Sequence, residues 1–493
     1  MNLANNPVIV PLLPALAGVF LAACSMLPTP PVSESAKDLI EEYSGIAEST
    51  PFDSLEWWKS FDDPVLDRIV EAVLDSNFDL AAAVARVDQA RARARIANAA
   101  AFPLINPSFG GNDFSVPTNV GIGAQLEQVG LDNAAFDAFG YVLPDEISLT
   151  TYSLGGTFAY EADFWGRNRN AALAAGAQRL ATESDLRAAR IGILAETVGT
   201  YLEIADLRRQ RSLTGDNIRI LRELQQQQTS RYDRGLADAR ALYAARRNLH
   251  AAEAELPSIE AALADAEGRL WVLLGGRRVD LAPILPDAVA PSWAMESVPA
   301  GVPADLLAQR PDVGAARQRM EAARLMVGAR RAELLPSLSL SGNIGVQGRD
   351  TEQMFDPDQW FQNLTLNLLA PAFQGARLQS NLALAEAQLD EAAATYGRAV
   401  ATAVNEVEAA LAGLEGSVNR HARLASLAED ARGEAALQER RYVSGVADYA
   451  NYLAASQTLV SASSALATAE RDLGFARLAL HRALGGAWTA EEE

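Results

Sequence analysis

The segment LLAQRPDVGAARQRMEAARLMVGARRAELLP, residues 306–336, decides the fold of this chain. It predicts a helix, because Pro311 suits a first helical turn and Asp312 puts a negative charge at the positive end of the helix dipole. Pro336 ends the helix, and residues 337–347 then alternate apolar and polar side chains as a β-strand does. We therefore expect a helix that leads through a proline directly into a strand.

The same unit occurs earlier in the chain. Asp79 and Pro103 stand 24 residues apart, and so do Asp312 and Pro336. In the same alignment Asn77 stands at the position of Arg310, Gln89 at that of Ala322 and Arg91 at that of Arg324. The sequence therefore predicts that a helix followed by a strand is used twice.

Two glycine-containing turns repeat as well. Gly235 and Gly445 are 210 residues apart, and so are Gly276 and Gly486. A single offset at two separate places indicates that one half of the chain is a copy of the other. We interpret the chain as an internal duplication.

The duplication predicts the domain organisation. The expected parts are a signal peptide (1–23), an N-terminal extended arm (24–63), a first repeat (64–276, with a helix, a strand pair at 104–162 and a long helical hairpin at 164–276), a connector (277–303), a second repeat (304–486, with a helix, a strand pair at 337–370 and a long helical hairpin at 373–486) and a C-terminal tail (487–493). We expect residues 64–101 to be helical throughout. We also expect the aromatic residues Trp57, Trp58 and Phe61 of the arm to pack onto the body.

The composition limits the partners. The 493 residues carry a formal net charge of −21, which argues against a nucleic-acid partner because a phosphate-binding face needs a surplus of Lys and Arg. The single cysteine, Cys24, rules out an intramolecular disulfide.

Cys24 follows an uncharged apolar run at residues 8–23 that ends in Leu-Ala-Ala. This pattern resembles a bacterial lipoprotein signal, in which the leader is removed before the cysteine and the cysteine is acylated. Ser25, in place of an aspartate, favours sorting to the outer membrane. No Lys or Arg precedes the apolar run, which leaves the true start codon open. The alternative is a buried apolar terminus with a chance cysteine.

Four strands of about ten residues are expected, each with one apolar and one polar face. Leu364, Leu366 and Leu368 alternate with Thr365 and Asn367, a pattern that suits a membrane barrel. Four strands cannot close a barrel, and a sheet in lipid must satisfy both of its edges. The chain must then supply a share of a barrel built from several copies, and three copies give twelve strands.

A helix of about 65 residues, on the order of 100 Å long, is expected between residues 164 and 232. Ile191, Leu194, Val198 and Tyr201 follow the spacing of a coiled-coil seam within it. Taken singly, such helices also fit a plain coiled-coil bundle, and the strands also fit a soluble sandwich. The combination with a duplication and a lipoprotein leader favours a membrane assembly.

Several short motifs now point to one family: LLAQRPD at 306–312, YEADFWGR at 160–167, the run from Arg441 to Tyr449, and LGGAW at 484–488. With these motifs the chain resembles the TolC-like outer-membrane efflux factors, in particular their lipoprotein branch (OprM/NodT-like). The resemblance covers almost everything after Cys24. It departs at Phe164-Trp165-Gly166, where the family commonly has Leu-Phe-Gly.

The resemblance implies a mainly α fold with membrane β: a long periplasmic α-helical barrel joined to a transmembrane β-barrel completed by trimerisation, four strands per chain. It implies a homotrimer in the outer-membrane lipid that works with a periplasmic adaptor and an inner-membrane pump of the RND type. The expected location is the outer membrane, with a lipid anchor and a large periplasmic portion.

No catalytic or metal-binding pattern is recognised. His250, His421 and His481 each stand without Cys or carboxylates at metal-ligand spacing, so we expect them on the surface or in grooves. The sequence therefore predicts a chain that is not an enzyme, with no cofactor and no metal. We expect a conduit.

The candidate functional residues lie at the two helical turns. Gly235 and Gly445 permit the reversals. The resemblance implies an inward-facing gate at this periplasmic tip, with Asp448, Tyr449 and Asp238 at the matching positions. Carboxylates repeated by threefold symmetry would favour cations there.

Two roles stay open at these turns. Asp448 is either a gate residue or an ordinary helix cap. The repeated Arg-Tyr pairs either brace the turns or contact the adaptor: Arg231, Tyr232, Arg441 and Tyr442.

The predicted function is the outer-membrane channel of a tripartite efflux system, a passive duct that exports drugs or other small molecules. One alternative with the same fold is a duct for type I protein secretion or metal export. A different class is a periplasmic coiled-coil adaptor or structural lipoprotein. Two hairpins and four alternating strands argue against an adaptor, which would have a single helical hairpin.

Overall fold

A computed structural model describes residues 56–117, 146–276, 285, 310–350 and 356–486. Its elements in chain order are η3 (Trp57–Phe61), α3 (Pro64–Ser76), α4 (Phe78–Ala99), β1 (Leu104–Pro117), β2 (Glu146–Ala162), α7 (Arg167–Asp233), α8 (Ala239–Leu273), α10 (Pro311–Ala332), β3 (Ser337–Gly348), η5 (Pro357–Gln359), β4 (Trp360–Leu369), α11 (Arg377–Val443) and α12 (Tyr449–Ala483). The predicted signal peptide with Cys24, the tail 487–493 and the connector 277–303 apart from Leu285 lie outside the described residues.

The chain divides into two compact units, which cut across both predicted repeats. One unit holds residues 1–91, 177–321 and 389–493, and is helical where it is described. The other holds residues 92–176 and 322–388, with the four strands and the helical segments next to them. We call them the helical unit and the strand unit. The division into repeats remains a prediction.

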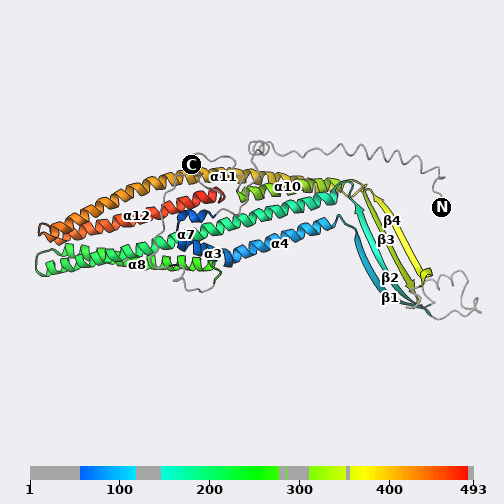
Figure 1. Cartoon of the computed structure of the whole chain (residues 1–493), viewed down its shortest axis with the longest axis horizontal. Helices are drawn as coiled ribbons and strands as arrows, with labels where there is room; N and C mark the ends of the chain where they lie inside the picture. The colour runs from blue at the N-terminus through cyan, green and yellow to red at the C-terminus, as the bar shows by residue number, and fades with distance from the viewer. Residues whose placement is uncertain (1–55, 118–145, 277–284, 286–309, 351–355, 487–493) are drawn as a thin grey trace, which may run out of the picture. The chain divides into compact units, whose positions relative to one another are not determined.

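The strand unit contains a four-stranded antiparallel sheet in the order β1-β2-β3-β4 (Figure 1). β1 and β2 have 14 and 17 residues, which exceeds the predicted ten, whereas β3 and β4 have 12 and 10. β2 and β3 pair on both sides, so β1 and β4 form the two edges of the sheet within the described chain.

The predicted alternation of side chains is present on β4. Leu364, Leu366 and Leu368 are 73%, 66% and 55% exposed in the single chain. The intervening residues are Thr365 and Asn367, so one face of this edge strand is apolar and the other polar. Such a row of exposed leucines stays stable only against lipid or another apolar surface.

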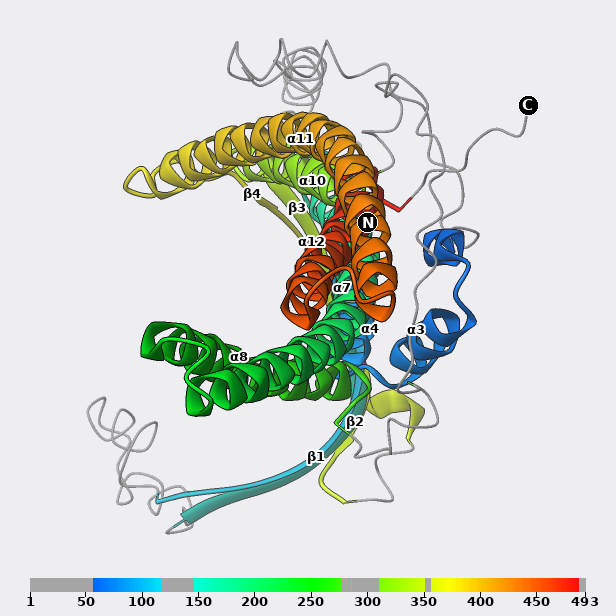
Figure 2. The same ribbon diagram turned by 90° about the vertical axis from the view of Figure 1, so that its left-hand side faces the viewer.

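The helical unit is built on two long helices and two return helices. α7 and α11 have 67 residues each, which confirms the predicted long helices, and α8 and α12 have 35 each. Figure 2 shows α7 beside α8, α11 beside α12, and α12 next to α7. Among the described helices, none has an 18-residue stretch apolar enough to cross a membrane.

The predicted helix over residues 64–101 is wrong in one respect, because it breaks at Asn77. The side-chain amide of Asn77 donates to the carbonyl of Leu273 at 3.0 Å, and its oxygen accepts from the N–H of Leu80 at 2.9 Å. Arg310 makes the matching bond in the second half, from Nη1 to the carbonyl of Ala483 at 2.8 Å. Both side chains therefore satisfy the last carbonyls of a return helix.

The described end of the N-terminal arm packs onto the helices, as predicted, but as a 3-10 helix rather than as extended chain. Trp57, Trp58 and Phe61 are buried and belong to one core cluster with residues of α7 and α8. A 3-10 turn places all three rings against the same core, which an extended segment does not do. Arg477 of α12 lies over the Phe61 ring, with its guanidinium carbon 4.7 Å from the ring centre.

The expectation for His481 is wrong, because it is a core residue and only 4% exposed. Its ring stacks on Trp57 with the ring centres 5.2 Å apart. Burial, followed by the nearby Arg477 charge, lowers the pKa of His481 to about 4. Trp57 of the arm covers this histidine. The sequence around His481 does not reveal this contact, because the arm is distant along the chain.

This depressed pKa predicts an acid-labile arm. In the unfolded chain His481 is protonated below about pH 6.5, whereas in the folded chain it is protonated only below about pH 4. The free energy of unfolding should therefore fall by up to about 3 kcal/mol as the pH drops through this window. His481→Phe keeps an aromatic ring on Trp57 and removes the titration. Between pH 7 and pH 4 the melting temperature should fall further for the wild type than for the variant. Equal falls in the two proteins would contradict this assignment.

Candidate functional site at the helical turns

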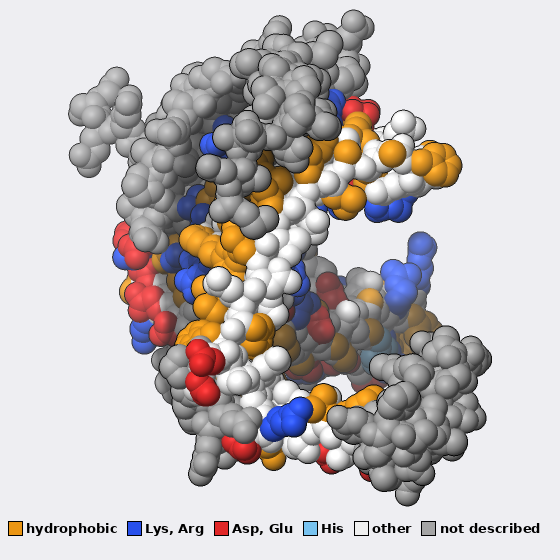
Figure 3. All heavy atoms as spheres, turned by 90° about the vertical axis from the view of Figure 1, so that its right-hand side faces the viewer, with side chains coloured by type: hydrophobic (Ala, Val, Ile, Leu, Met, Phe, Trp, Pro, Cys, Tyr) orange, Lys and Arg blue, Asp and Glu red, His pale blue; other side chains and the backbone are white. Residues whose placement is uncertain are grey.

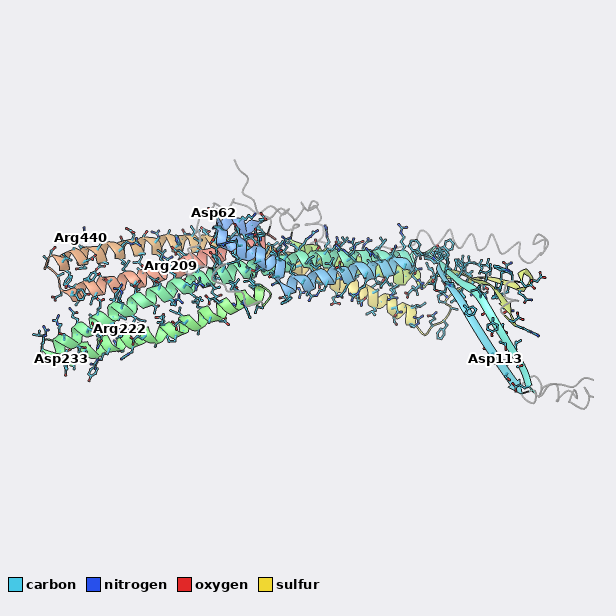
Figure 4. The ribbon with its side chains drawn as sticks, turned by 60° about the horizontal axis from the view of Figure 1, so that its bottom comes forward. Asp62, Asp113, Arg209, Arg222, Asp233 and Arg440 are labelled. Atoms are coloured by element: carbon cyan, nitrogen blue, oxygen red, sulfur yellow. The ribbon has the colours of Figure 1, made fainter. Side chains whose placement is uncertain are left out.

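The candidate residues lie where the long helices reverse. α7 ends at Asp233 and α11 at Val443, and α8 and α12 begin a few residues later. Figure 4 places Asp233 and Arg440 at this end of the helical unit. The two turns belong to different hairpins of the same unit.

The first turn is closed by two backbone hydrogen bonds. The N–H of Gly235 donates to the carbonyl of Tyr232 at 2.8 Å, and the N–H of Leu236 donates to the carbonyl of Arg231 at 2.7 Å. Gly235 has a φ of 71°, in the left-handed region that glycine adopts without strain. This is the Schellman arrangement that ends many helices.

The second turn repeats the pattern. The N–H of Gly445 donates to the carbonyl of Tyr442, and that of Val446 to the carbonyl of Arg441, both at 2.9 Å. Gly445 has a φ of 75°. Each Arg-Tyr pair thus closes its turn through its backbone carbonyls. The backbone of the pairs therefore has the bracing role. The side chains of the pairs are left for other contacts.

The two aspartates differ. The carboxylate of Asp238 accepts from the N–H of Ala241 at 2.9 Å and so caps α8. Asp448 stands at the equivalent position before α12, but its side chain makes no capping hydrogen bond. Both side chains are exposed. The cap interpretation therefore describes Asp238, and Asp448 keeps its carboxylate for another partner.

Tyr449 belongs to a cluster of three tyrosines. Its ring centre lies 4.8 Å from that of Tyr442 and 5.8 Å from that of Tyr452, and Tyr442 and Tyr452 stack at 6.4 Å. Two predicted residues, Tyr442 and Tyr449, are thus brought together, with Tyr452 as an addition. The cluster joins the end of α11 to the first turns of α12.

The hydroxyl of Tyr449 links the two hairpins. It donates to a carboxylate oxygen of Glu223 on α7 at 2.5 Å. This hydrogen bond, together with partial burial, raises the pKa of Tyr449 to about 12, because the carboxylate favours the protonated phenol. The tyrosine therefore stays a donor throughout the physiological range, and α12 is fastened to α7 at the tip.

A second polar link lies further along the same two helices. The Gln210 side chain donates to the carbonyl of Ser464 and to the hydroxyl of Thr468, each at 3.2 Å, and accepts from the Ser464 hydroxyl at 2.6 Å. Arg471 pairs with the buried Asp206 at 3.1 Å. This partly buried polar network, with Asp206 as its buried member, holds α12 against α7.

A third contact, between Arg209 and Glu470, lies at the same level of α7, and Figure 4 shows Arg209 on this helix. Arg222, also labelled there, pairs instead with Glu253 of α8 at 2.8 Å, within the first hairpin. The polar contacts of α7 therefore hold two neighbours at once, its own return helix and α12 of the second hairpin.

Sequence reasoning missed Glu223, although a signal was available. With the offset of 210, Tyr449 corresponds to Ala239 and Glu223 corresponds to Gly433. The link therefore exists in one copy only. Where equivalent positions in the two halves hold different residues, the contacts made there occur in one half only.

The candidate site consists of contacts between helices. Among the described residues no group of three or more His, Cys, Asp or Glu side chains is placed to hold a metal ion. Hydrogen bonds join the long helices to one another. The chain also contains an open sheet with an apolar face that suits lipid. This combination is typical of a subunit of a membrane channel whose strands lie in lipid.

Comparisons with known proteins agree. The family model described as "Outer membrane efflux protein" matches residues 69–276 and 302–486. The pyoverdine export outer membrane protein OpmQ of Pseudomonas putida is 31% identical over 479 residues, 96% of each chain. The outer membrane protein OprJ of Pseudomonas aeruginosa is 31% identical over 487 residues, 96% of this chain and 95% of its own length.

A solved structure has the same fold. The outer membrane protein VceC of Vibrio cholerae superposes with a TM-score of 0.73 at 26% identity, over 88% of this chain and 98% of its own. The chain belongs to the outer membrane efflux protein family. It is an outer-membrane efflux channel protein with a large periplasmic helical portion, which confirms the predicted fold class, the function and the outer-membrane location. The lipid anchor stays a prediction. The family consists of channel proteins rather than enzymes.

The contact between Tyr449 and Glu223 makes a testable prediction. Tyr449→Phe removes one hydrogen bond to a charged group, which is worth about 1.5–3 kcal/mol. Hydrogen–deuterium exchange in the first turns of α12 should therefore become faster. Glu223→Gln should have a similar effect, and the double variant should add little to either single one.

Tyr442→Phe is the matched control, because its ring lies in the same cluster while the link to α7 stays intact. It should leave the exchange of α12 close to that of the wild type. Fully additive effects of Tyr449→Phe and Glu223→Gln would show that the two side chains do not act on each other in solution.

Proposed function

We propose that this chain forms a passive exit duct as a homotrimer, in a tripartite efflux system with a periplasmic adaptor and an inner-membrane pump of the RND type. The single observation that carries the proposal is an open four-stranded sheet with one apolar face, attached to two long helical hairpins. A duct requires no chemistry of its own, so energy for transport would come from the pump.

The edges of the sheet support an assembly of several copies. β1 and β4 each have one side without a partner strand in the described chain, and unpaired backbone groups in lipid cost several kcal/mol each. Pairing β4 of one copy with β1 of the next removes both edges. Three copies give twelve strands, an even number that leaves a lumen.

The turns supply a surface for the adaptor. Leu236, Val443 and Val446 are 65%, 78% and 69% exposed at the two reversals. Exposed apolar side chains on loops mark contact sites for other proteins. Together with the Arg-Tyr side chains, they form the surface that we assign to the adaptor.

The exported compounds are small molecules in this proposal. The P. putida relative is named for the export of pyoverdine. We propose that this chain exports drugs or other small compounds as well. We also propose Cys24 as its lipid attachment residue. Protein secretion and metal export share the fold and differ in the pump.

We assign the gate to the tip. The Tyr449–Glu223 link holds the hairpins together, and the exposed Asp448 adds a carboxylate that no helix N–H uses. In a trimer both features repeat three times around one axis. A ring of carboxylates favours cations and narrows the passage.

Conductance in planar bilayers tests this function. We expect the purified wild type to form small, cation-preferring channels. Asp448→Ala should lower the cation preference, and Tyr449→Phe should increase the conductance about twofold or more, because it frees α12 from α7. Asp430→Ala, which removes one exposed carboxylate from the body of α11, is the matched control and should behave as the wild type.

Each outcome separates the claims. A silent bilayer with folded protein would overturn the duct and favour the structural-lipoprotein alternative. Channels that respond equally to Asp448→Ala and Asp430→Ala would keep the duct and remove the gate assignment.

A further inference from the structure

The junctions between strands and helices in the strand unit carry exposed aromatic residues. Phe102 precedes β1, Phe164 follows β2 and Phe373 follows β4, and they are 65%, 65% and 90% exposed. At the fourth junction Leu334 is 37% exposed. Aromatic rings of this kind form girdles at the two surfaces of a membrane barrel. These residues therefore mark the depth at which the sheet leaves the hydrocarbon.

Arginines follow directly on the helical side of this girdle. We define the junction collar as residues 92–102, 161–176, 322–336 and 370–388. It contains eight arginines against four carboxylates, a net charge of +4 in a chain whose net charge is −21. The arginines are Arg93, Arg95, Arg167, Arg169, Arg324, Arg330, Arg331 and Arg377.

The first turns of two helices place arginines in the headgroup layer. Arg167 begins α7 three residues after Phe164, and Arg169 follows in the same helical turn, which rises about 5.4 Å. Arg377 begins α11 four residues after Phe373. A headgroup region is about 5–8 Å deep on each side of the hydrocarbon, so the first turns of α7 and α11 share one layer with the headgroups.

The collar is one continuous surface. The side chain of Asn168 donates to the carbonyl of Ala100 at 3.4 Å, which joins the start of α7 to the end of α4. Trp165 donates to the carbonyl of Pro336 at 2.7 Å, which joins the α7 start to the end of α10. An ion pair from Arg331 to Glu386 at 3.0 Å then joins α10 to α11. Figure 3, seen from the strand side, shows hydrophobic side chains with Lys and Arg side chains beside them.

Part of the collar charge is already paired. Arg167 pairs with Glu161 and Arg330 with Glu333, both at 2.6 Å. These two arginines and Arg377 line a pocket of about 310 Å³ at the junction. Its other polar walls are the carboxylates of Glu161, Asp163 and Glu333 and the side chains of Gln374, Asn381 and Ser337.

Other arginines keep their charge for a partner. Arg169 and Arg377 are exposed, and their side chains form no ion pair with the described residues. The backbone N–H of Arg169, rather than its guanidinium, uses the carboxylate of Asp163 at 2.7 Å. Arg377 lies in the wall of the pocket. Two cations of this kind at headgroup depth suit the charge of a lipid phosphate.

We infer that the junction collar is a binding surface for anionic phospholipid headgroups of the inner leaflet of the outer membrane. The inference rests on the outer-membrane placement of the chain and goes beyond the proposed duct, because it names a lipid class and the residues that bind it. Guanidinium groups bind phosphate through paired N–H donors, and arginines near a membrane surface attract anionic lipid. The bound lipid would hold the barrel at a fixed depth.

The test compares lipid binding of the detergent-purified protein with phosphatidylglycerol, phosphatidylethanolamine and inorganic phosphate, by native mass spectrometry and thermal melting. Phosphatidylglycerol should bind and raise the melting temperature, whereas phosphatidylethanolamine should do so weakly. The double variant Arg169→Gln, Arg377→Gln should bind phosphatidylglycerol at least tenfold more weakly, since each arginine at a membrane surface contributes about fivefold.

The matched control removes two exposed arginines from the helical unit: Arg246→Gln and Arg247→Gln. It should bind phosphatidylglycerol as the wild type does. Equal loss in both variants would reduce the effect to overall charge and overturn the inference. Stabilisation by inorganic phosphate equal to that by phosphatidylglycerol would contradict a lipid surface.

Conductance separates this inference from the duct. Both double variants should still form channels in planar bilayers. Unchanged lipid binding together with altered ion selectivity in the collar variant would place these arginines in the lumen and overturn the lipid assignment, while the duct would stand. Loss of channels in every variant and in the wild type would instead contradict the proposed function.

Discussion

Backbone hydrogen bonding at the two edges of the sheet is the constraint on which the rest of the structure depends. A four-stranded sheet with an exposed apolar face on β4 cannot remain open in lipid, because each unpaired N–H or C=O in hydrocarbon costs several kcal/mol. Closure needs strands from other copies. Once copies are arranged around an axis, their helical hairpins are arranged around it too, and a duct follows from the same requirement. The chain contributes a share of an assembly, and each of its surfaces has to be considered in that light.

The predicted duplication accounts for the regularity of the chain, and the positions at which the two halves differ include contacts between the hairpins. Asn77 and Arg310 make the same bond to equivalent carbonyls, of Leu273 and Ala483, so the two halves keep their helix ends alike. Asp206 and Arg471, in contrast, correspond to Gly416 and Ala261 in the other half. Their ion pair joins α7 to α12 inside one chain. Within the described residues, then, the repeat carries the scaffold and its exceptions carry the link between hairpins.

Sequence reasoning reached most of the fold because its signals are local and periodic. The long helices, the strands and the glycine turns each follow from spacing, and the motif around Pro311 identified the family resemblance. Three features escaped it for one physical reason, namely that a distant segment sets them. Asn77 breaks a helical stretch because the end of α8 receives its amide, and His481 is buried because the arm reaches across it. Glu223 became visible as a site residue only when α12 was placed beside α7. The gate candidates Asp448 and Asp238 look alike in sequence, and only the geometry separates the capping residue from the free one.

Cross-linking between the sheet edges tests the central claim most directly. Ser108 lies on β1 and Asn363 on β4, at opposite edges of the sheet. A chain with Ser108→Cys and Asn363→Cys, treated in membranes with a short bis-maleimide, should give bands of two and three chains and nothing larger. Each single variant should stay uncross-linked. Bands that stop at two chains, or a ladder that continues beyond three, would contradict a barrel closed by three copies.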